Sequence, residues 1–123
     1  MKGVGIDLCS ISRMERTLQT NEGFLKRYYT QEERAYIEGR GKMGAHSAAA
    51  MYAAKEAFLK AVGLGIGRGV RLDEIGVSHD ANGAPFYALL GAAEEKLHAL
   101  GAEKAFLSLS HEADVAAAVC VID

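Results

Sequence analysis

Apolar and polar residues alternate through residues 3–9, GVGIDLC, near the start of the chain. A period of two is typical of a β-strand, and it places Val4, Ile6 and Leu8 on one face. The opposite face carries Asp7 among glycines and a cysteine. The pattern therefore predicts a strand with one carboxylate on a face that small residues keep open.

Two short helices are predicted from capping-box spacing, in which Ser or Thr precedes Glu by three residues. Ser12 and Glu15 predict a helix through SRMERTLQ, and Thr30 and Glu33 predict another through QEERAYIEG. These segments and the residues beside them carry many of the Lys and Arg side chains of the chain.

A long helix is predicted from about residue 45 to residue 62, with Gly63 and Gly65 as its stop signal. It is apolar nearly all round, so we expect it to be central and mostly buried. Glu56 and Lys60 lie four residues apart and share one of its faces. The simplest interpretation is a surface ion pair, but a buried carboxylate needs a cation, a metal or a ligand beside it.

The second half of the chain predicts two hairpins separated by a helix. Asn82-Gly83 joins IGVSHD to APFYALL, AAEEKLHAL is helical, and HEAD joins AFLSLS to VAAAVCVID. The order of strand, helices, hairpin, helix and hairpin predicts an α+β fold with an antiparallel sheet packed around a long central helix. The length fits a single domain over residues 1–123.

Composition adds a charge asymmetry to this picture. Residues 1–71 hold 12 Lys and Arg against 7 Asp and Glu, whereas residues 72–123 hold 2 against 9. The first half is therefore expected to dock an acidic partner. The chain has no long apolar run and no secretory pattern, so we expect a cytoplasmic protein with no membrane and no nucleic-acid partner.

The acidic residues suggest a metal site. Asp7 and Glu56 would supply two oxygen ligands to one divalent ion, and Lys60 would complete a set suited to phosphate chemistry. The alternative for Asp7 is a carboxylate that caps a helix or lies on an edge strand. Spacing in the sequence does not decide whether the three side chains meet.

Other candidates are weaker. The segment GLGIGRG, with Arg68 and Arg71 beside it, resembles a phosphate-binding loop in composition, but it follows a helix and matches no P-loop pattern. A helix stop followed by a tight connection explains it equally well. His111 stands at the end of a predicted strand, either as a structural residue or as a substrate contact. Cys9 and Cys120 are expected to be plain buried thiols.

Three blocks resemble, in order and spacing, the holo-acyl-carrier-protein synthases, which are small bacterial 4'-phosphopantetheinyl transferases. The blocks are GVGIDLCSISRMER, AAKEAFLKAVGLGIGRGV and LSLSHEADVAAAVCVI, with NGAPF between the last two. The resemblance implies the 4'-phosphopantetheinyl transferase fold. It also implies an enzyme that moves the 4'-phosphopantetheine arm of coenzyme A onto a serine of apo-acyl carrier protein, releasing adenosine 3',5'-bisphosphate, in support of fatty acid biosynthesis.

The resemblance also implies residue roles. Asp7 and Glu56 would bind Mg²⁺, Lys60 would face the diphosphate, and His111 would contact coenzyme A. The general base is left open between Glu56 and a water held near Asp7. Members of this class look like homotrimers with active sites at subunit interfaces. The coenzyme A site would further include the glycine-rich residues Gly63, Gly65, Ile66 and Gly67.

Two further positions bear on the partners. Arg13 and Arg27 match basic residues with which the family binds acidic carrier proteins, in agreement with the basic first half.

Met51 stands where the family commonly has a phosphate-binding arginine, so Lys55, Arg68 or a residue of another subunit would have to replace it. This departure keeps two alternatives open: a non-catalytic coenzyme A or nucleotide-binding module, and a Mg²⁺-dependent hydrolase of the diphosphate.

Overall fold

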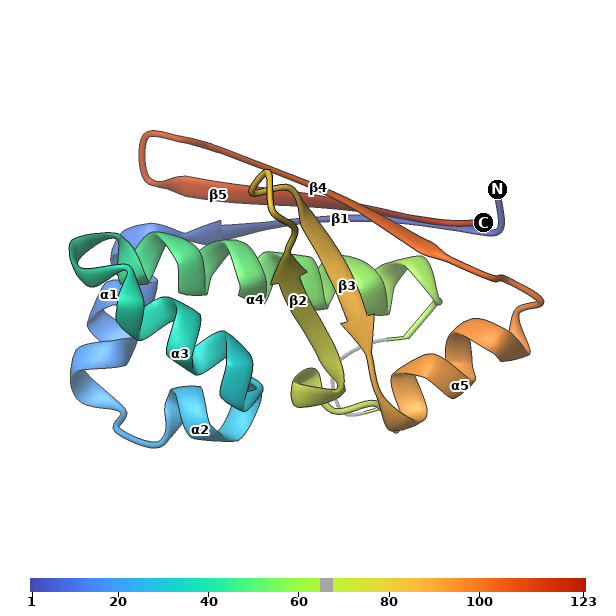
Figure 1. The fold of residues 1–123 in the computed structure, drawn as a ribbon, viewed down its shortest axis with the longest axis horizontal. Coiled ribbons are helices and arrows are strands. Elements are labelled where there is room, and N and C mark those ends of the chain that lie inside the picture. Colours follow the sequence, from blue (N-terminus) through green and yellow to red (C-terminus); the bar gives the residue numbers. More distant parts are fainter. Residues whose placement is uncertain (65–67) are drawn as a thin grey trace.

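The structure is a computed structural model that describes residues 1–64 and 68–123. Its centre is the helix α4 (Gly44–Ala61), which confirms the long helix predicted from the sequence. A three-stranded sheet covers one side of α4, and a two-stranded hairpin crosses another (Figure 1). Gly65, Ile66 and Gly67, which the resemblance assigned to the coenzyme A site, lie outside the described residues.

The larger sheet has the order β1-β5-β4 and is antiparallel throughout, with β1 at Gly3–Ser10, β5 at Val115–Ile122 and β4 at Ala105–Glu112. On its inner face, the small residues Ala116 and Ala118 of β5 are buried against α4. The predicted first strand and the last hairpin are therefore confirmed, and they share one sheet.

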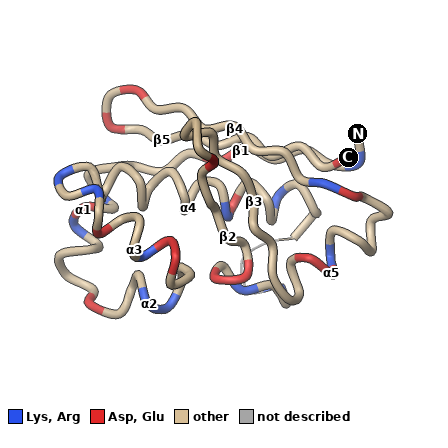
Figure 2. The backbone as a smooth tube through the Cα atoms, viewed as in Figure 1, with Lys and Arg blue, Asp and Glu red and all other residues tan. Residues whose placement is uncertain are grey.

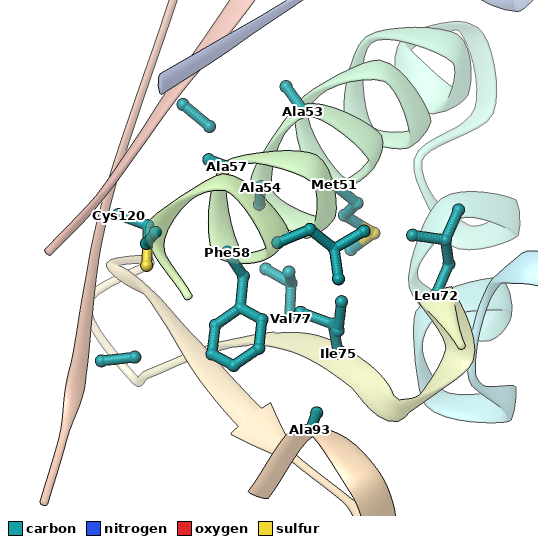
Figure 3. Close-up of a cluster of buried hydrophobic side chains, with 14 of the residues drawn as sticks. Met51, Ala53, Ala54, Ala57, Phe58, Leu72, Ile75, Val77, Ala93 and Cys120 are labelled. Atoms are coloured by element: carbon teal, nitrogen blue, oxygen red, sulfur yellow. The ribbon is translucent and has the colours of Figure 1, made fainter. Parts of the chain in front are cut away.

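The smaller sheet is the hairpin of β2 (Ile75–His79) and β3 (Pro85–Leu89). The Asn82-Gly83 turn predicted it, and Gly83 has the positive φ of 84° that such a turn requires. The fold thus contains two antiparallel sheets around α4 instead of one. Side chains from both sheets meet the helix in the core, where Phe58, Ile75 and Val77 pack together (Figure 3).

The remaining helices lie near the two ends of α4. Helices α1 (Ile11–Thr20), α2 (Phe24–Tyr28) and α3 (Gln31–Gly39) gather near its beginning, and α5 (Gly91–Ala99) lies near its end (Figure 1). Short 3₁₀ turns occur at Gly41–Met43 and Leu72–Glu74. The short helix α2 had no clear signal in the sequence. Within residues 1–64 and 68–123, each helix is too short or too polar to cross a membrane.

The two predicted capping boxes have different outcomes. The box of Thr30 and Glu33 is confirmed at the start of α3. The box of Ser12 and Glu15 is wrong, because Ser10 caps α1 by accepting a hydrogen bond from the backbone N–H of Arg13 at 3.2 Å. The hydroxyl of Ser12 instead donates to a carboxylate from the other end of the chain.

A buried ion pair fixes the rotation of α4 about its axis. The Lys55 Nζ donates to Glu33 Oε1 at 2.7 Å and to the backbone carbonyls of Leu72 and Ile75 at 3.0 and 2.9 Å. Burial lowers the pKa of Lys55, and the neighbouring Glu33 opposes that shift. Successive residues of a helix project about 100° apart, so anchoring Lys55 toward β2 turns Glu56 toward another side.

Candidate active site

Two glycines bring β1 against the backbone of α4. A Cβ added to Gly3 would collide with the carbonyl oxygen of Ala61, and one added to Gly5 would collide with that of Ala57. Only residues without a side chain permit this approach. The GVGID motif is therefore a packing requirement that places the next residue of that face, Asp7, beside α4.

Asp7 meets Lys60 at this contact. The Lys60 Nζ donates to Asp7 Oδ1 and to the backbone carbonyl of Ile6, both at 3.0 Å. The Asp7 side chain is 12% exposed, whereas that of Lys60 is 56% exposed and Glu56 is half-buried. The face that Glu56 and Lys60 share is therefore only partly buried, because this side of α4 opens to solvent beside the edge strand β1.

The two carboxyl groups lie close enough to affect each other. Burial raises the pKa of Glu56, the charge of Asp7 and a side-chain hydrogen bond with Asp7 raise it further, and Lys60 opposes the shift. One lysine therefore stands against two carboxyl groups. A divalent cation would relieve this imbalance, and oxygen donors are the ligands that Mg²⁺ prefers.

The donor set fits magnesium better than a fully protein-bound metal. Among the described residues, no group of three or more His, Cys, Asp or Glu is arranged to hold a metal ion. Mg²⁺ is commonly held by one or two carboxylates, with waters and substrate phosphates as its other ligands. Asp7 and Glu56 are of that kind and number.

Aromatic side chains border the carboxyl groups. Tyr52 lies one turn before Glu56 and is half-buried, and its ring centroid is 6.0 Å from that of Phe24 on α2. Burial, and next the charge of Glu56, raise the pKa of Tyr52 to about 12, so its phenol stays neutral and able to donate a hydrogen bond. The spacing of four residues between Tyr52 and Glu56 places both on the same helix face, as the sequence indicated.

Both cysteines carry free thiols. Cys120 is buried as expected, whereas Cys9 is only half-buried and shares the strand face of Asp7. Burial, with the Asp7 charge as the next cause, raises the pKa of Cys9 to about 11. A thiol that stays protonated is a poor nucleophile, so Cys9 adds no covalent chemistry to this site.

His111 lies in a different place, near the start of α4. Its ring centroid is 6.3 Å from that of His46, on the first turn of the helix. His46 and Glu56 are ten residues apart, which is about 15 Å along a helix axis. The structure therefore brings Asp7, Glu56 and Lys60 together but does not bring His111 to them within one chain.

The surroundings of His111 form a cavity of about 190 Å³ between α3, α4, β2 and β4. The described residues that line it include no Asp or Glu. The Nδ1 of His46 is buried and has no hydrogen-bond partner among the described residues. The polar and aromatic side chains of the lining are Tyr36, Arg40, His46, Ser47, His79, Ser110 and His111.

Met51 borders the same cavity and is 1% exposed. Lys55 does not replace an arginine there, because its ammonium is bound to Glu33 and to two backbone carbonyls. Arg40 and His46 line the cavity instead. Nothing in the local sequence around them signalled this position, since α3 and β4 complete the cavity through tertiary contacts.

The predicted partner-binding residues are both accessible. Arg13 is exposed on α1, and Arg27 is exposed on α2, where its guanidinium lies 5.5 Å from the ring centroid of Tyr28. The Lys and Arg residues of α2 stand out along its backbone in Figure 2. Gly63 ends α4 with a positive φ of 81°, which confirms the helix stop.

Known proteins resemble this chain along nearly its whole length. The family model of the 4'-phosphopantetheinyl transferase superfamily matches residues 3–120. A holo-[acyl-carrier-protein] synthase of Myxococcus xanthus is 48% identical over 124 residues, covering 99% of this chain and 94% of that protein. The chain therefore belongs to the 4'-phosphopantetheinyl transferase superfamily, as its sequence blocks predicted.

Solved structures agree on the fold. The crystal structure of holo-[acyl-carrier-protein] synthase from Neisseria meningitidis matches with a TM-score of 0.88 and 37% identity, covering 100% of this chain and 98% of that one. The enzyme of that name from Helicobacter pylori, in complex with coenzyme A, matches with a TM-score of 0.83 and 30% identity, covering 98% and 99%. The predicted fold is thereby confirmed.

Proposed function

We propose that this protein transfers the 4'-phosphopantetheine arm of coenzyme A to a serine of apo-acyl carrier protein, giving holo-acyl carrier protein and adenosine 3',5'-bisphosphate. The observation that carries the proposal is the meeting of Asp7, Glu56 and Lys60 where β1 touches α4. The comparisons support it, since proteins covering nearly the whole chain bear the name holo-[acyl-carrier-protein] synthase.

The transfer requires a serine hydroxyl to attack the β-phosphorus of a diphosphate. Asp7 and Glu56 would hold Mg²⁺, which when bound supplies positive charge to the phosphate oxygens. Lys60 adds a second positive charge. An ammonium has three N–H donors, two of which point to Asp7 and to the carbonyl of Ile6, so the third can donate to a phosphate oxygen.

A proton must leave the serine hydroxyl during the attack. Glu56 is one candidate for the proton acceptor, because its carboxyl group lies beside Asp7, whose side chain binds Lys60. A water held near Asp7 is the alternative base. Tyr52 is neutral at physiological pH and serves as a hydrogen-bond donor at the edge of the site.

The active protein is proposed to be a homotrimer. The outer face of the three-stranded sheet carries Val4, Ile6 and Leu8, which are 57, 62 and 65% exposed, and also Phe106 and Val115. A contiguous apolar sheet face of this kind needs a cover, and further copies of the chain provide it. Such an assembly would let the His111 cavity of one subunit serve the Asp7 site of another.

The cavity around His111 is proposed to receive the nucleotide end of coenzyme A. Arg40 and the buried imidazole of His46 suit a phosphate group. Tyr36 stacks on His79 with ring centroids 4.3 Å apart, and such a pair suits contact with the flat ring of a base. In this chain Arg40 and His46 would take the place of the arginine missing at Met51. We further propose that the glycine-rich segment after α4 contributes to the coenzyme A site, as the sequence resemblance implies.

The acceptor is proposed to be an acidic carrier protein of fatty acid synthesis that docks on Arg13 and Arg27. Such docking weakens with added salt, because the charges lie at the surface. We propose the cytoplasm as the compartment, since both cysteines carry free thiols, as is usual where the surroundings are reducing.

The test is a mass measurement on apo carrier protein incubated with the protein, coenzyme A and Mg²⁺. The expected result is the added mass of one phosphopantetheine arm, which disappears when EDTA removes the metal. Coenzyme A binding without any added mass would favour a binding module. Release of phosphopantetheine in the absence of carrier would favour a diphosphate hydrolase.

The shared-site arrangement has its own test. Glu56→Gln and His111→Ala chains are each expected to be inactive or weak alone. Co-expression of the two should restore activity, because some interfaces then pair an intact Asp7 site with an intact His111 cavity. Light scattering should give the mass of three chains. If the co-expressed chains form a trimer but activity is not restored, this would contradict a site shared between subunits.

A further inference from the structure

The turn between β4 and β5 is tied to the start of α1. The Asp114 carboxylate accepts hydrogen bonds from the backbone N–H of Ser12 at 2.8 Å, from the Ser12 hydroxyl at 2.7 Å and from the Ser10 hydroxyl at 2.9 Å. The Asp114 carbonyl accepts from the backbone N–H of Ile11 at 2.8 Å. We call this set of contacts the Asp114 clip.

The clip supplies hydrogen-bond acceptors that the start of a helix usually receives from neighbouring residues. The first N–H groups of a helix have no partner inside it. In α1, Ser10 serves the N–H of Arg13, while Asp114 serves those of Ile11 and Ser12. The first turn of α1 is Ile11, Ser12, Arg13 and Met14, so the stabilising negative charge at this positive helix end comes from Asp114.

The turn has an unusual backbone that fits this purpose. Ala113 has a φ of 52°, in the left-handed region that non-glycine residues seldom adopt. Such a conformation persists where surrounding contacts hold it. Here it directs both the carbonyl and the carboxylate of Asp114 toward α1.

The clip sets the direction in which α1 presents its charged side. Ile11 and Met14 are each 4% exposed and pack into the core, whereas Arg13 between them is exposed. β1 itself is held along its whole length by β5, with Asp7 opposite Ala118. Loosening the clip therefore frees the start of α1 without moving Asp7.

We propose that Asp114 is a positioning residue for carrier-protein docking, which holds α1 so that Arg13 meets the acidic partner. This inference rests on the proposed function, in which Arg13 contacts the carrier. Asp114 touches neither substrate, and its effect passes through α1. The kinetic signature is a change in the KM for the carrier that leaves kcat and the KM for coenzyme A in place.

The test compares Asp114→Asn with a matched change in the other hairpin. Asp80 Oδ1 likewise accepts two backbone N–H bonds in its own turn, from Asn82 at 2.8 Å and Ala84 at 2.9 Å. Asp114→Asn keeps one acceptor oxygen but loses the negative charge and the acceptor for the Ser10 and Ser12 hydroxyls. It should raise the KM for apo carrier protein about three- to fivefold, the order of effect of losing a charge at a helix N-terminus, with kcat and the KM for coenzyme A within about twofold. Asp80→Asn should change none of the three.

Two more readouts separate positioning from general stability. Hydrogen exchange at the amides of Ser12 and Arg13 should quicken in Asp114→Asn and stay unchanged in Asp80→Asn. In an Arg13→Ala background, Asp114→Asn should add little to the KM for the carrier, because both changes act through the same contact. Ser12→Ala, which removes only the hydroxyl contact, should have a smaller effect of the same sign.

The outcomes are distinguishable. An unchanged KM for the carrier in Asp114→Asn overturns the inference, and so does an equal loss of kcat and of thermal stability. Wild-type protein that neither binds nor modifies any carrier overturns the proposed function itself. Wild-type protein that is active while Asp114→Asn is fully active overturns the positioning role alone.

Discussion

Helix α4 carries two lysine–carboxylate pairs with opposite surroundings. Lys55 and Glu33 are 0 and 1% exposed, whereas Lys60 and Asp7 are 56 and 12% exposed. All three donors of the Lys55 ammonium have acceptors, in Glu33 and in two backbone carbonyls. The buried pair is thus complete, and it has no capacity left for a ligand.

The open pair is incomplete in two ways. Lys60 has acceptors for two donors, and Asp7 shares its surroundings with the second carboxyl group of Glu56. Both features leave charge that a metal ion and a phosphate would satisfy. We therefore expect the Lys60–Asp7 pair, whose charges are unbalanced, to take part in catalysis. The Lys55–Glu33 pair, whose donors all have acceptors, is expected to stabilise the fold.

The largest effect is expected from removing each lysine in turn. Lys55→Met leaves the Glu33 carboxylate buried without its partner, which should cost about 3–5 kcal/mol in the free energy of unfolding. Lys60→Met should cost less, about 1 kcal/mol, because the ammonium that is lost is more than half exposed to water. Urea unfolding of both variants measures the difference. Equal losses would contradict the division into a structural and a chemical pair.

A smaller effect is expected from the glycine that brings the open pair together. Gly5→Ala forces a methyl group against the carbonyl of Ala57, which should cost about 1–3 kcal/mol in the free energy of unfolding and reduce transfer activity. Gly23→Ala is the matched control, since a Cβ there meets no described atom within 4 Å. Transfer and unfolding measured on both variants check this. Full activity in Gly5→Ala would show that close approach of β1 is dispensable.

The smallest effect is a pH dependence of stability from Glu56. The folded-state pKa of Glu56 is raised, so the protonated side chain favours the folded state. This contribution to stability is fully present below the unfolded-state pKa of about 4.3, and it is lost as the pH rises through the folded-state pKa. Between the unfolded-state and folded-state pKa values of Glu56, the Tm of the wild-type protein should fall with rising pH, and Glu56→Gln should remove this part of the fall. Added Mg²⁺ should raise the Tm of the wild-type protein above that range and not that of Glu56→Gln. Identical Tm–pH curves would contradict the raised pKa.

Local patterns in the sequence predicted much of the fold. The alternation in β1, the Asn82-Gly83 turn and the capping box of Thr30 and Glu33 depend on neighbouring residues, and all three are present. The box predicted at Ser12 failed because Ser10 caps α1 and Asp114, distant in the sequence, binds the N–H and hydroxyl of Ser12. Capping by a remote residue has no local signal.

The site was predictable in part for the same reason. The motifs singled out Asp7, Glu56 and Lys60, which the structure brings together. Helical periodicity did not separate the buried Lys55 from the exposed Lys60, because which side of an apolar helix faces solvent depends on the sheets around it. The distance of His111 from this site likewise follows from the tertiary arrangement.

The role of Glu56 in transfer is tested most directly by the rate of phosphopantetheine transfer by Glu56→Gln beside that of the wild-type protein. Mass spectrometry of the carrier gives the rate, and circular dichroism confirms that both proteins are folded. The transfer rate of Glu56→Gln is expected to fall about 100-fold or more with the fold intact, because a neutral amide is a poor magnesium ligand and no base. A folded Glu56→Gln protein with wild-type transfer rates would contradict this role of Glu56.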